Sequence, residues 1–288
     1  MGRGARIAGS EALMAFDLGW QLILELLVLG SFTGFLAGLL GVGGGAMLVP
    51  FMTLLLTLKG FPEAYVVKMA VATSLTTICF TSISSVRAHH QRGAVRWDIV
   101  KLLAPGIVLG SLLGAQIAKA LPANWLALLF ALFIGFSATQ MFLDKKPKPT
   151  RQLPQGAGMF GAGGVIGTLS ALVGAGGAFV SVPFMTWCNV PIRTAVATSA
   201  ALGFPIALAG TVGYVYAGWS LHDMPPGTLG FIYLPALVVI AAASVTTAPL
   251  GARTAHRIDT AKLKRVFAVL LYSLASYMLY KGVKGLVS

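Results

Sequence analysis

Charged residues are scarce in this chain. Asp, Glu, Lys and Arg make up only 10% of its 288 residues, whereas they form about a quarter of an ordinary soluble domain. Hydrophobic residues make up 57%, so the polar surface is too small to cover a water-soluble globule. This shortage of charge excludes a typical soluble enzyme or binding domain and predicts a protein that crosses a lipid bilayer several times.

Residues that bind metals or perform catalysis are also few. Cys79 and Cys188 lie in or beside apolar runs without the spacing of metal ligands, so we expect small, buried side chains. His89 and His90 lie in a basic loop, where solvated side chains are expected. The sequence has no Ser/His/Asp set, no zinc-protease motif and no pair of carboxylates within an apolar run. It therefore predicts no metal and no cofactor, and a membrane enzyme is the least supported functional class.

Acidic residues are outnumbered by basic ones, 8 to 21. This excess does not indicate a nucleic-acid partner, because the basic residues fall in short loops between apolar runs rather than on one basic face. Such loops favour the cytoplasmic side of a membrane, so the lipid bilayer is the expected partner. Residues 1–17 are basic but lack the apolar core and cleavage site of a secretory signal, and we expect them to form an N-terminal tail.

Long apolar runs dominate the rest of the sequence. Most have the roughly 20 residues that a helix needs to cross a bilayer. The second and seventh are too short to cross alone, and each follows a cluster of glycines. The ten runs cover approximately residues 18–40, 46–58, 66–86, 99–121, 124–143, 156–173, 178–188, 194–217, 228–250 and 263–280.

Two motifs occur twice, in the same order. Residues 40–53, LGVGGGAMLVPFMT, align with residues 173–186, VGAGGAFVSVPFMT. Residues 68–74, KMAVATS, align with residues 193–199, RTAVATS. Chance similarity between apolar runs does not preserve such an order, so the motifs indicate a duplicated unit. The predicted organisation is an N-terminal tail (1–17), a first transmembrane repeat (18–143), a cytoplasmic linker rich in Pro and Lys (144–155) and a second transmembrane repeat (156–288).

The basic loops exchange places between the two copies. The loop at residues 87–101 is basic in the first copy, whereas its counterpart in the second copy has no Lys or Arg. Residues 253–265 are basic in the second copy, whereas their counterpart in the first copy has only Lys119. Because positive loops favour the cytoplasm, the copies should cross the membrane in opposite senses, with 14 of the 21 Lys and Arg residues on the cytoplasmic side and both termini outside. The predicted fold class is an all-α, polytopic membrane protein with two inverted-topology repeats of about five helical elements, each opened by a glycine-broken hairpin.

The glycine clusters predict where a ligand binds. A helix that restarts after each cluster directs unpaired N–H groups and the positive end of its dipole into the membrane interior. Glycine lets a ligand approach the backbone and adopts the positive φ angles of an anion-binding nest. We therefore expect a small oxyanion, not a metal cation, between the two breaks. The predicted substrate-binding residues are Gly43, Gly44, Gly45 and Ala46 at the first break, Gly176, Gly177, Ala178 and Phe179 at the second, and the hydroxyl-bearing Thr73, Ser74, Thr198 and Ser199.

Each of these features also has a plainer interpretation. The glycines could serve only the close packing of helices, and the hydroxyls could bond only to their own helix or a neighbouring one. Lys68 and Arg193, which precede the repeated hydroxyls, could draw an anion into a vestibule or extend to the membrane interface. Glu25, the one carboxylate well inside an apolar run, could couple proton movement to transport or face the interface.

At these residues the sequence resembles the TauE/SafE family of sulfite and sulfonate exporters, also called the toluene-sulfonate uptake permease family. The resemblance extends from about residue 18 to residue 280 and rests on GLLGVGGGAMLVP and ALVGAGGAFVSVP, each followed by AVATS. It implies a multi-pass carrier of the bacterial inner membrane that moves sulfite or an organosulfonate such as sulfoacetate, and the family name points to export. The second break has Ala178 where the first has Gly45, so the two half-sites could contribute unequally.

The predicted function is secondary transport of a small sulfur oxyanion by alternating access around a midplane anion site. The alternative is a passive anion channel that uses the same glycines as a constriction. The sequence indicates neither an oligomeric state nor a coupling ion.

Overall fold

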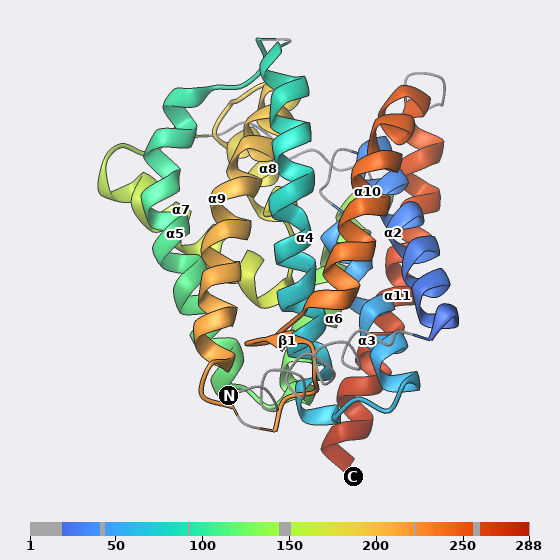
Figure 1. Ribbon diagram of the computed structural model, residues 1–288. Coiled ribbons are helices and arrows are strands. Elements are labelled where there is room, and N and C mark those ends of the chain that lie inside the picture. Colours follow the sequence, from blue (N-terminus) through green and yellow to red (C-terminus); the bar gives the residue numbers. More distant parts are fainter. Residues whose placement is uncertain are drawn as a thin grey trace, which may run out of the picture.

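The computed structural model describes residues 19–40, 44–91, 93–143, 151–221, 223–255 and 260–287, which form ten helices and one pair of short strands (Figure 1). In the first half of the chain the helices are α2 (Trp20–Leu40), α3 (Gly45–Leu58), α4 (Glu63–Gln91), α5 (Trp97–Ala120) and α6 (Ala123–Leu143). In the second half they are α7 (Ala157–Val173), α8 (Ala178–Trp187), α9 (Ile192–Gly218), α10 (Leu234–Ala255) and α11 (Thr260–Val287), with strands β1 (Thr228–Leu229) and β2 (Ile232–Tyr233) before α10.

The ten helices follow the ten predicted apolar runs in order, and an all-α class of fold is confirmed apart from the strands. One local expectation is wrong. The ninth run was expected to be helical from about residue 228, but its first residues form the antiparallel pair β1 and β2, and α10 begins only at Leu234. Gly227 and Gly230 have φ angles of 80° and 58°. A side chain would strain both positions, so these glycines permit a tight turn where the apolar composition alone predicts helix.

Within the described ranges, seven helices are long and apolar enough to cross a bilayer, as expected of a multi-pass membrane protein. The prediction that the second and seventh elements are too short to cross alone is confirmed, since α3 has 14 residues and α8 has 10. At a rise of 1.5 Å per residue these helices are about 21 Å and 15 Å long. Helix α7, which we expected to cross, has 17 residues and falls just below the length of a full span.

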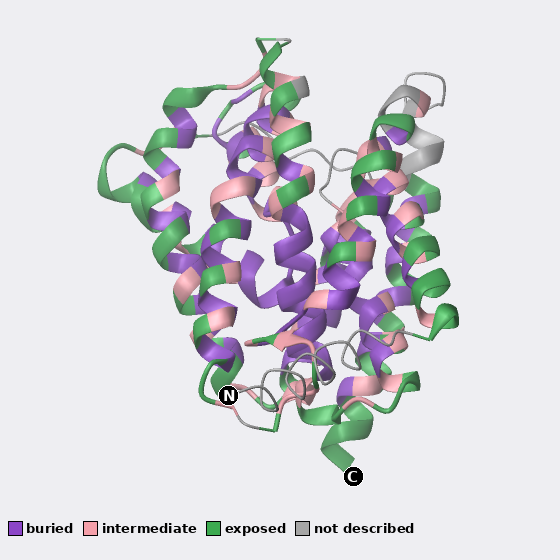
Figure 2. Cartoon of the chain, in the orientation of Figure 1, coloured by how far each residue is buried: buried purple, intermediate pink, exposed green. Residues whose placement is uncertain are grey.

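Helices α4 and α9 form the centre of the bundle. The most apolar part of α4 is 78% buried, whereas that of α2 is only 28% buried. The two central helices pack against each other and run in opposite directions (Figure 1). Exposed residues lie mainly on the outer helices, and buried ones gather at the centre (Figure 2). Many exposed side chains are large and apolar, as at Leu132 and Val238, which suits contact with lipid tails.

Glycines allow two pairs of helices from opposite halves to pack at very short distance. Helix α2 packs along α10, and α5 packs along α7. A Cβ atom on Gly38 would lie 1.9 Å from the carbonyl oxygen of Ala248, and one on Gly110 would lie 2.1 Å from that of Gly164. No side chain fits at such distances, so the small residues set the helix spacing. The glycines that pack in this way at four-residue intervals are Gly30, Gly34 and Gly38 on α2 and Gly106, Gly110 and Gly114 on α5.

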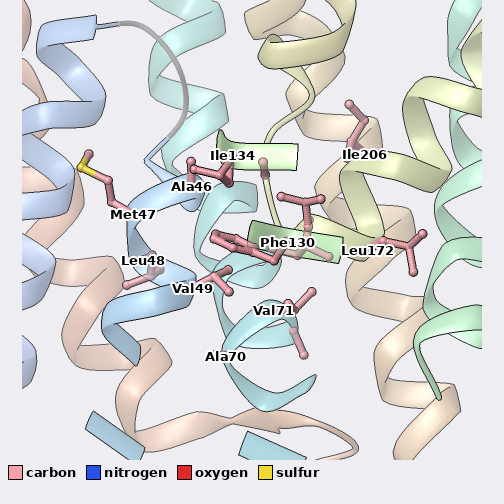
Figure 3. Packing of buried hydrophobic residues seen from close by; sticks show 14 of the residues in the cluster. Ala46, Met47, Leu48, Val49, Ala70, Val71, Phe130, Ile134, Leu172 and Ile206 are labelled. Atoms are coloured by element: carbon pink, nitrogen blue, oxygen red, sulfur yellow. The ribbon is translucent and has the colours of Figure 1, made fainter. Parts of the chain in front are cut away.

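The buried apolar core is shared by both halves of the chain. Figure 3 shows Val49 of α3 and Phe130 of α6 close to Val71 of α4, with Leu172 of α7 and Ile206 of α9 nearby. This core surrounds the start of α3, which directly follows the first glycine break.

The glycine contacts lead to a test of helix packing. A Cβ atom on Gly167 of α7 would lie 2.3 Å from the carbonyl oxygen of Ile107 on α5. Gly167→Ala should therefore push the two helices apart and lower the free energy of unfolding by about 1–3 kcal/mol. Gly161→Ala, on the same helix but with no atom within 4 Å of the added Cβ, is the control and should be neutral or slightly stabilising. Thermal unfolding in detergent measures both, and equal melting temperatures would contradict the packing.

Candidate functional site

Helices α3 and α8 begin in the same way. Each follows a glycine in the left-handed conformation, Gly44 with a φ angle of 63° and Gly177 with one of 80°. The carbonyl of Gly44 accepts hydrogen bonds of 3.1 Å from the N–H groups of both Met47 and Leu48, and the carbonyl of Gly177 accepts an equivalent pair. The repeated glycine motifs therefore produce the same local geometry twice.

The first N–H groups of these helices have no partner among the described backbone acceptors. Among the residues that the structure describes, no backbone acceptor is found for the N–H groups of Gly45 and Ala46 in α3 or of Ala178 and Phe179 in α8. Free N–H groups and the positive end of the helix dipole favour negative charge at both positions. Gly43, the remaining predicted residue of the first break, lies outside the described residues.

The two breaks lie against each other inside the protein. A Cβ atom on Gly45 would lie 2.3 Å from the carbonyl oxygen of Gly174 and 3.0 Å from the hydroxyl of Ser74. That hydroxyl donates a hydrogen bond of 2.9 Å to the same carbonyl, between residues 100 positions apart in the chain. Gly176 is buried as well, and a Cβ atom added to it would lie 3.6 Å from the Cγ2 atom of Ile78. The structure thus brings together both breaks and one of the predicted hydroxyls.

Two of the predicted hydroxyls hold the starts of other helices. Thr73 Oγ1 accepts a hydrogen bond of 3.1 Å from the N–H group of Tyr233, and Thr198 Oγ1 accepts one of 3.1 Å from the N–H group of Arg96. Tyr233 directly precedes α10 and Arg96 directly precedes α5. Both threonines therefore fix a helix start that belongs to the opposite half of the chain.

Ser199 supports the second break. Its hydroxyl lies 2.7 Å from that of Ser181, which donates a hydrogen bond of 3.0 Å to the carbonyl of Gly177. In this conformation all four predicted hydroxyls therefore bond within the protein, as in their plainer interpretation.

Lys68 and Arg193 occupy equivalent places at opposite ends of the central helices, but their environments differ. Lys68 Nζ donates a hydrogen bond of 2.8 Å to the carbonyl of Lys119, at the end of α5, and lies 5.9 Å from the centre of the Phe231 ring. Lys68 is only 7% exposed, whereas Arg193 is exposed. The Lys68 ammonium thus stabilises the negative end of the α5 dipole inside the protein and does not line an open vestibule.

Glu25 is remote from both breaks. Its carboxylate forms an ion pair with Lys59, with an Oε2–Nζ distance of 3.2 Å, and its side chain is 43% exposed. Fifteen residues separate it from the end of α2, a distance of about 22 Å along the helix axis. Its place fits the interfacial interpretation better than the coupling one.

A cavity with a hydroxyl lining lies at the first break, and sequence reasoning missed it. The cavity adjoins Gly44 and Gly45 and has room for about one water molecule. Serine and threonine in several apolar runs were visible in the sequence, but only the packing of α2, α4 and α10 brings four of them together. The hydroxyl-bearing residues that line this cavity are Thr33, Thr77, Thr81 and Ser244.

The chemistry of this region suits reversible binding. The residues lining the cavity include no Asp, Glu, Lys, Arg or His, and no group of three or more potential metal ligands occurs among the described residues. Neutral N–H and O–H groups can hold an oxyanion and release it again, and neither is a nucleophile paired with a base.

Glycine-started half-helices that meet inside a bundle of apolar helices are typical of membrane transporters. The family described as sulfite exporter TauE/SafE matches residues 26–278 of the chain. This match includes both breaks and nearly the whole bundle, so the chain belongs to the TauE/SafE family.

Similar proteins carry transporter names. A Haemophilus influenzae protein named "Probable membrane transporter protein" is 36% identical, over 90% of this chain and 98% of its own length. "Probable membrane transporter protein YunE" of Bacillus subtilis is 26% identical, over 90% and 97%. An Arabidopsis thaliana protein, "Sulfite exporter TauE/SafE family protein 3", is 32% identical over 53% of this chain and 33% of its own length. No solved structure matches the chain. The chain is therefore a multi-pass membrane transporter.

The contact between the breaks can be tested with two glycines of the repeated motifs. Gly45→Ala places a Cβ atom 2.3 Å from the carbonyl of Gly174, so we expect the breaks to separate and the free energy of unfolding to fall by about 1–3 kcal/mol. Gly176→Ala is the matched control, because its Cβ atom would make only an ordinary contact of 3.6 Å with Ile78. Thermal unfolding in detergent compares the two variants. If they melt at the same temperature, the two breaks do not touch as described.

Proposed function

We propose that this transporter exports a small sulfur oxyanion, sulfite or an organosulfonate, by alternating access. The observation that carries the proposal is the contact between the two breaks, where Gly45 at the start of α3 packs against the carbonyl of Gly174 just before α8. This contact joins the segments from which the half-helices α3 and α8 start, and a helix N-terminus favours an anion; membership of the TauE/SafE family supports sulfur oxyanions as the substrate. The residues proposed to bind the anion are those of the two breaks, Gly43–Ala46 and Gly176–Phe179 by position, with the four hydroxyls of Thr73, Ser74, Thr198 and Ser199 as supports.

Packing between the halves supports two inverted repeats, residues 18–143 and 156–288, joined by a linker at 144–155. In such a fold, each helix pair that joins the halves has a counterpart, and α2 with α10 corresponds to α7 with α5. The hydrogen bond from Tyr233 to Thr73 likewise corresponds to the one from Arg96 to Thr198. The starts of α4 and α9 at opposite ends of the bundle (Figure 1) agree with opposite insertion in the membrane.

The short helices suit a hairpin at the start of each repeat. Since α3 and α8 are too short to cross alone, each can return to the side from which the preceding helix came. This arrangement is the one in which the basic loops at 87–101 and 253–265 and the linker share the cytoplasmic side. The inner membrane of a bacterium is the location we propose, and the bacterial relatives agree with it.

The closed interior favours a carrier over a channel. The cavity at the first break has room for about one water molecule, whereas a channel needs a continuous path for its ion. Counterflow of labelled sulfite in proteoliposomes separates these functions, because a carrier saturates and exchanges its substrate across the membrane. Current without early saturation or exchange would favour the channel.

The left-handed glycines provide a test of the anion site. Gly44→Ala and Gly177→Ala place a side chain at positive φ angles beside the free N–H groups, which costs about 1–2 kcal/mol and narrows the site. We expect sulfite transport in proteoliposomes to fall at least tenfold in both variants. Gly60→Ala is the matched control, because Gly60 has a similar φ angle of 75° but no atom within 4 Å of the added Cβ and lies at the far end of α3.

The control shares the backbone strain of the test variants but lies away from both breaks. It should therefore lose some thermal stability, although less than Gly177→Ala, whose Cβ atom would also lie 2.3 Å from the Cδ1 atom of Ile206, and it should retain transport. Normal transport by both the Gly44 and Gly177 variants would exclude the breaks as the site.

A further inference from the structure

The two breaks share a backbone but differ in the side chains that surround them. At the first break, Thr33 of α2, Thr77 of α4 and Ser244 of α10 are each at least nine-tenths buried and face a common cavity, which half-buried Thr81 completes. The hydroxyls come from three different helices, so their convergence is a product of the fold and not of one polar segment.

The matching positions of the second half are all apolar. The alignment of the glycine motifs places Ile166 opposite Thr33, and the alignment of the AVATS motifs places Leu202 and Ile206 opposite Thr77 and Thr81. The correspondence of the starts of α5 and α10 places Ile107 opposite Ser244. Ile206 fills the space beside the second break, because its Cδ1 atom would lie 2.3 Å from a Cβ atom on Gly177.

We infer that the substrate binds at the first glycine break only, in its hydroxyl-lined cavity. We also infer that this site takes a sulfur oxyanion with a single negative charge. This inference rests on the proposed transport function and specifies its substrate. Bisulfite and simple alkyl sulfonates belong to this class. Sulfate, the sulfite dianion and sulfoacetate, which carries a carboxylate as well as a sulfonate, do not.

The charge of the ligand follows from the donors around the cavity. They are hydroxyls and the N–H group of Gly45, and none of the described residues that line the cavity is cationic. The end of one helix supplies about half a positive charge, which can offset much of a single negative charge but not two. A second buried charge would lack a partner, and burying it would cost several kcal/mol.

The hydroxyls can change partners when the anion arrives. Thr33 Oγ1 now donates to the carbonyl of Leu29 at 2.8 Å, Thr77 Oγ1 donates to that of Thr73 at 2.9 Å, and Ser244 Oγ donates to that of Gly30 at 2.9 Å. Leu29, Gly30 and Thr73 lie within helices, where backbone N–H groups already occupy their carbonyls. Rotation of each O–H group toward the cavity therefore leaves no carbonyl unpaired. The oxygens also keep lone pairs that can accept the proton of bisulfite.

The cavity has room for about one water molecule, which is too little for a sulfur oxyanion. A sulfur oxyanion enters when α4 moves away from α2, α3 and α10, a movement of the kind that alternating access requires.

The test compares ions of different charge on the full chain in proteoliposomes. Methanesulfonate stays singly charged, sulfate stays doubly charged, and bisulfite becomes the sulfite dianion as the pH rises through neutrality. We expect methanesulfonate to compete with labelled sulfite on both sides of neutral pH and sulfate not to compete. We also expect sulfite transport to fall as the pH rises. Equal competition by sulfate would overturn the charge assignment but leave the transport function intact, whereas no sulfite transport at any pH would overturn the transport function itself.

Hydroxyl variants test the location of the ligand. Thr33→Val and Thr77→Val keep the side-chain shape but remove a donor to the anion, so each should raise the concentration of methanesulfonate needed for half-maximal competition about tenfold. Thr246→Val is the matched control, because Thr246 lies on the same helix as Ser244 but bonds only to the carbonyls of Ala242 and Ala243, away from the cavity. It should leave the competition unchanged.

Unchanged competition in both the Thr33 and Thr77 variants would overturn the assignment of the hydroxyls. Melting temperatures of the ligand-free variants identify any that do not fold, and the comparison of ions on the unaltered chain does not depend on them.

Discussion

Backbone polar groups inside a bilayer must find partners within the protein, because no water is present to supply them. The chain meets this requirement with helices everywhere except at two glycine breaks. There the carbonyls of Gly44 and Gly177 accept bonds from the following turn, and the carbonyl of Gly174 accepts the hydroxyl of Ser74. Among the described residues, the first N–H groups of α3 and α8 have no backbone acceptor. A buried donor without a partner costs about 1–3 kcal/mol, so an anion at the breaks, as we propose, would gain binding energy from groups that otherwise weaken the fold.

The two halves of the chain repeat features of the backbone but not the side chains around them, as the proposed duplication would leave them. The left-handed glycines and the threonines that hold helix starts need specific backbone geometry, and they occur in both halves. Residues around them are free to diverge, since an isoleucine or a threonine can occupy the same helix position. Lys68 is buried against the end of α5, while its counterpart Arg193 is exposed. The positions that carry hydroxyls around the first break carry isoleucine or leucine in the second half. The two halves are therefore equivalent in architecture but not in chemistry.

The sequence predicted what depends on neighbours along the chain and missed what depends on packing. Hydropathy located all ten helices, and the glycine motifs located both breaks, because composition and local backbone preference decide these features. The partners of Thr73 and Thr198 lie more than 100 positions away and could not be read from a local pattern. The four-residue glycine spacing on α2 and α5 was a readable signal for helix packing. The turn at Gly227 and Gly230 was hidden by the apolar residues around it.

Close glycine packing also bears on what can move. Helices α2 and α10 are joined by backbone contacts too short for a side chain, and so are α5 and α7, yet each pair combines one helix from either half. Such pairs resist separation. In the alternating access that we propose, the two repeats would therefore not rock as separate bodies, although inverted-repeat symmetry alone suggests that they do. One body would contain α2, α10 and the neighbouring α11, α6 and α3, and the other would contain α5, α7, α9 and α8, with α4 packed along α9 (Figure 1). Because α3 and α4 would then belong to different bodies, their relative movement would open and close the cavity at the first break, where we propose that the anion binds.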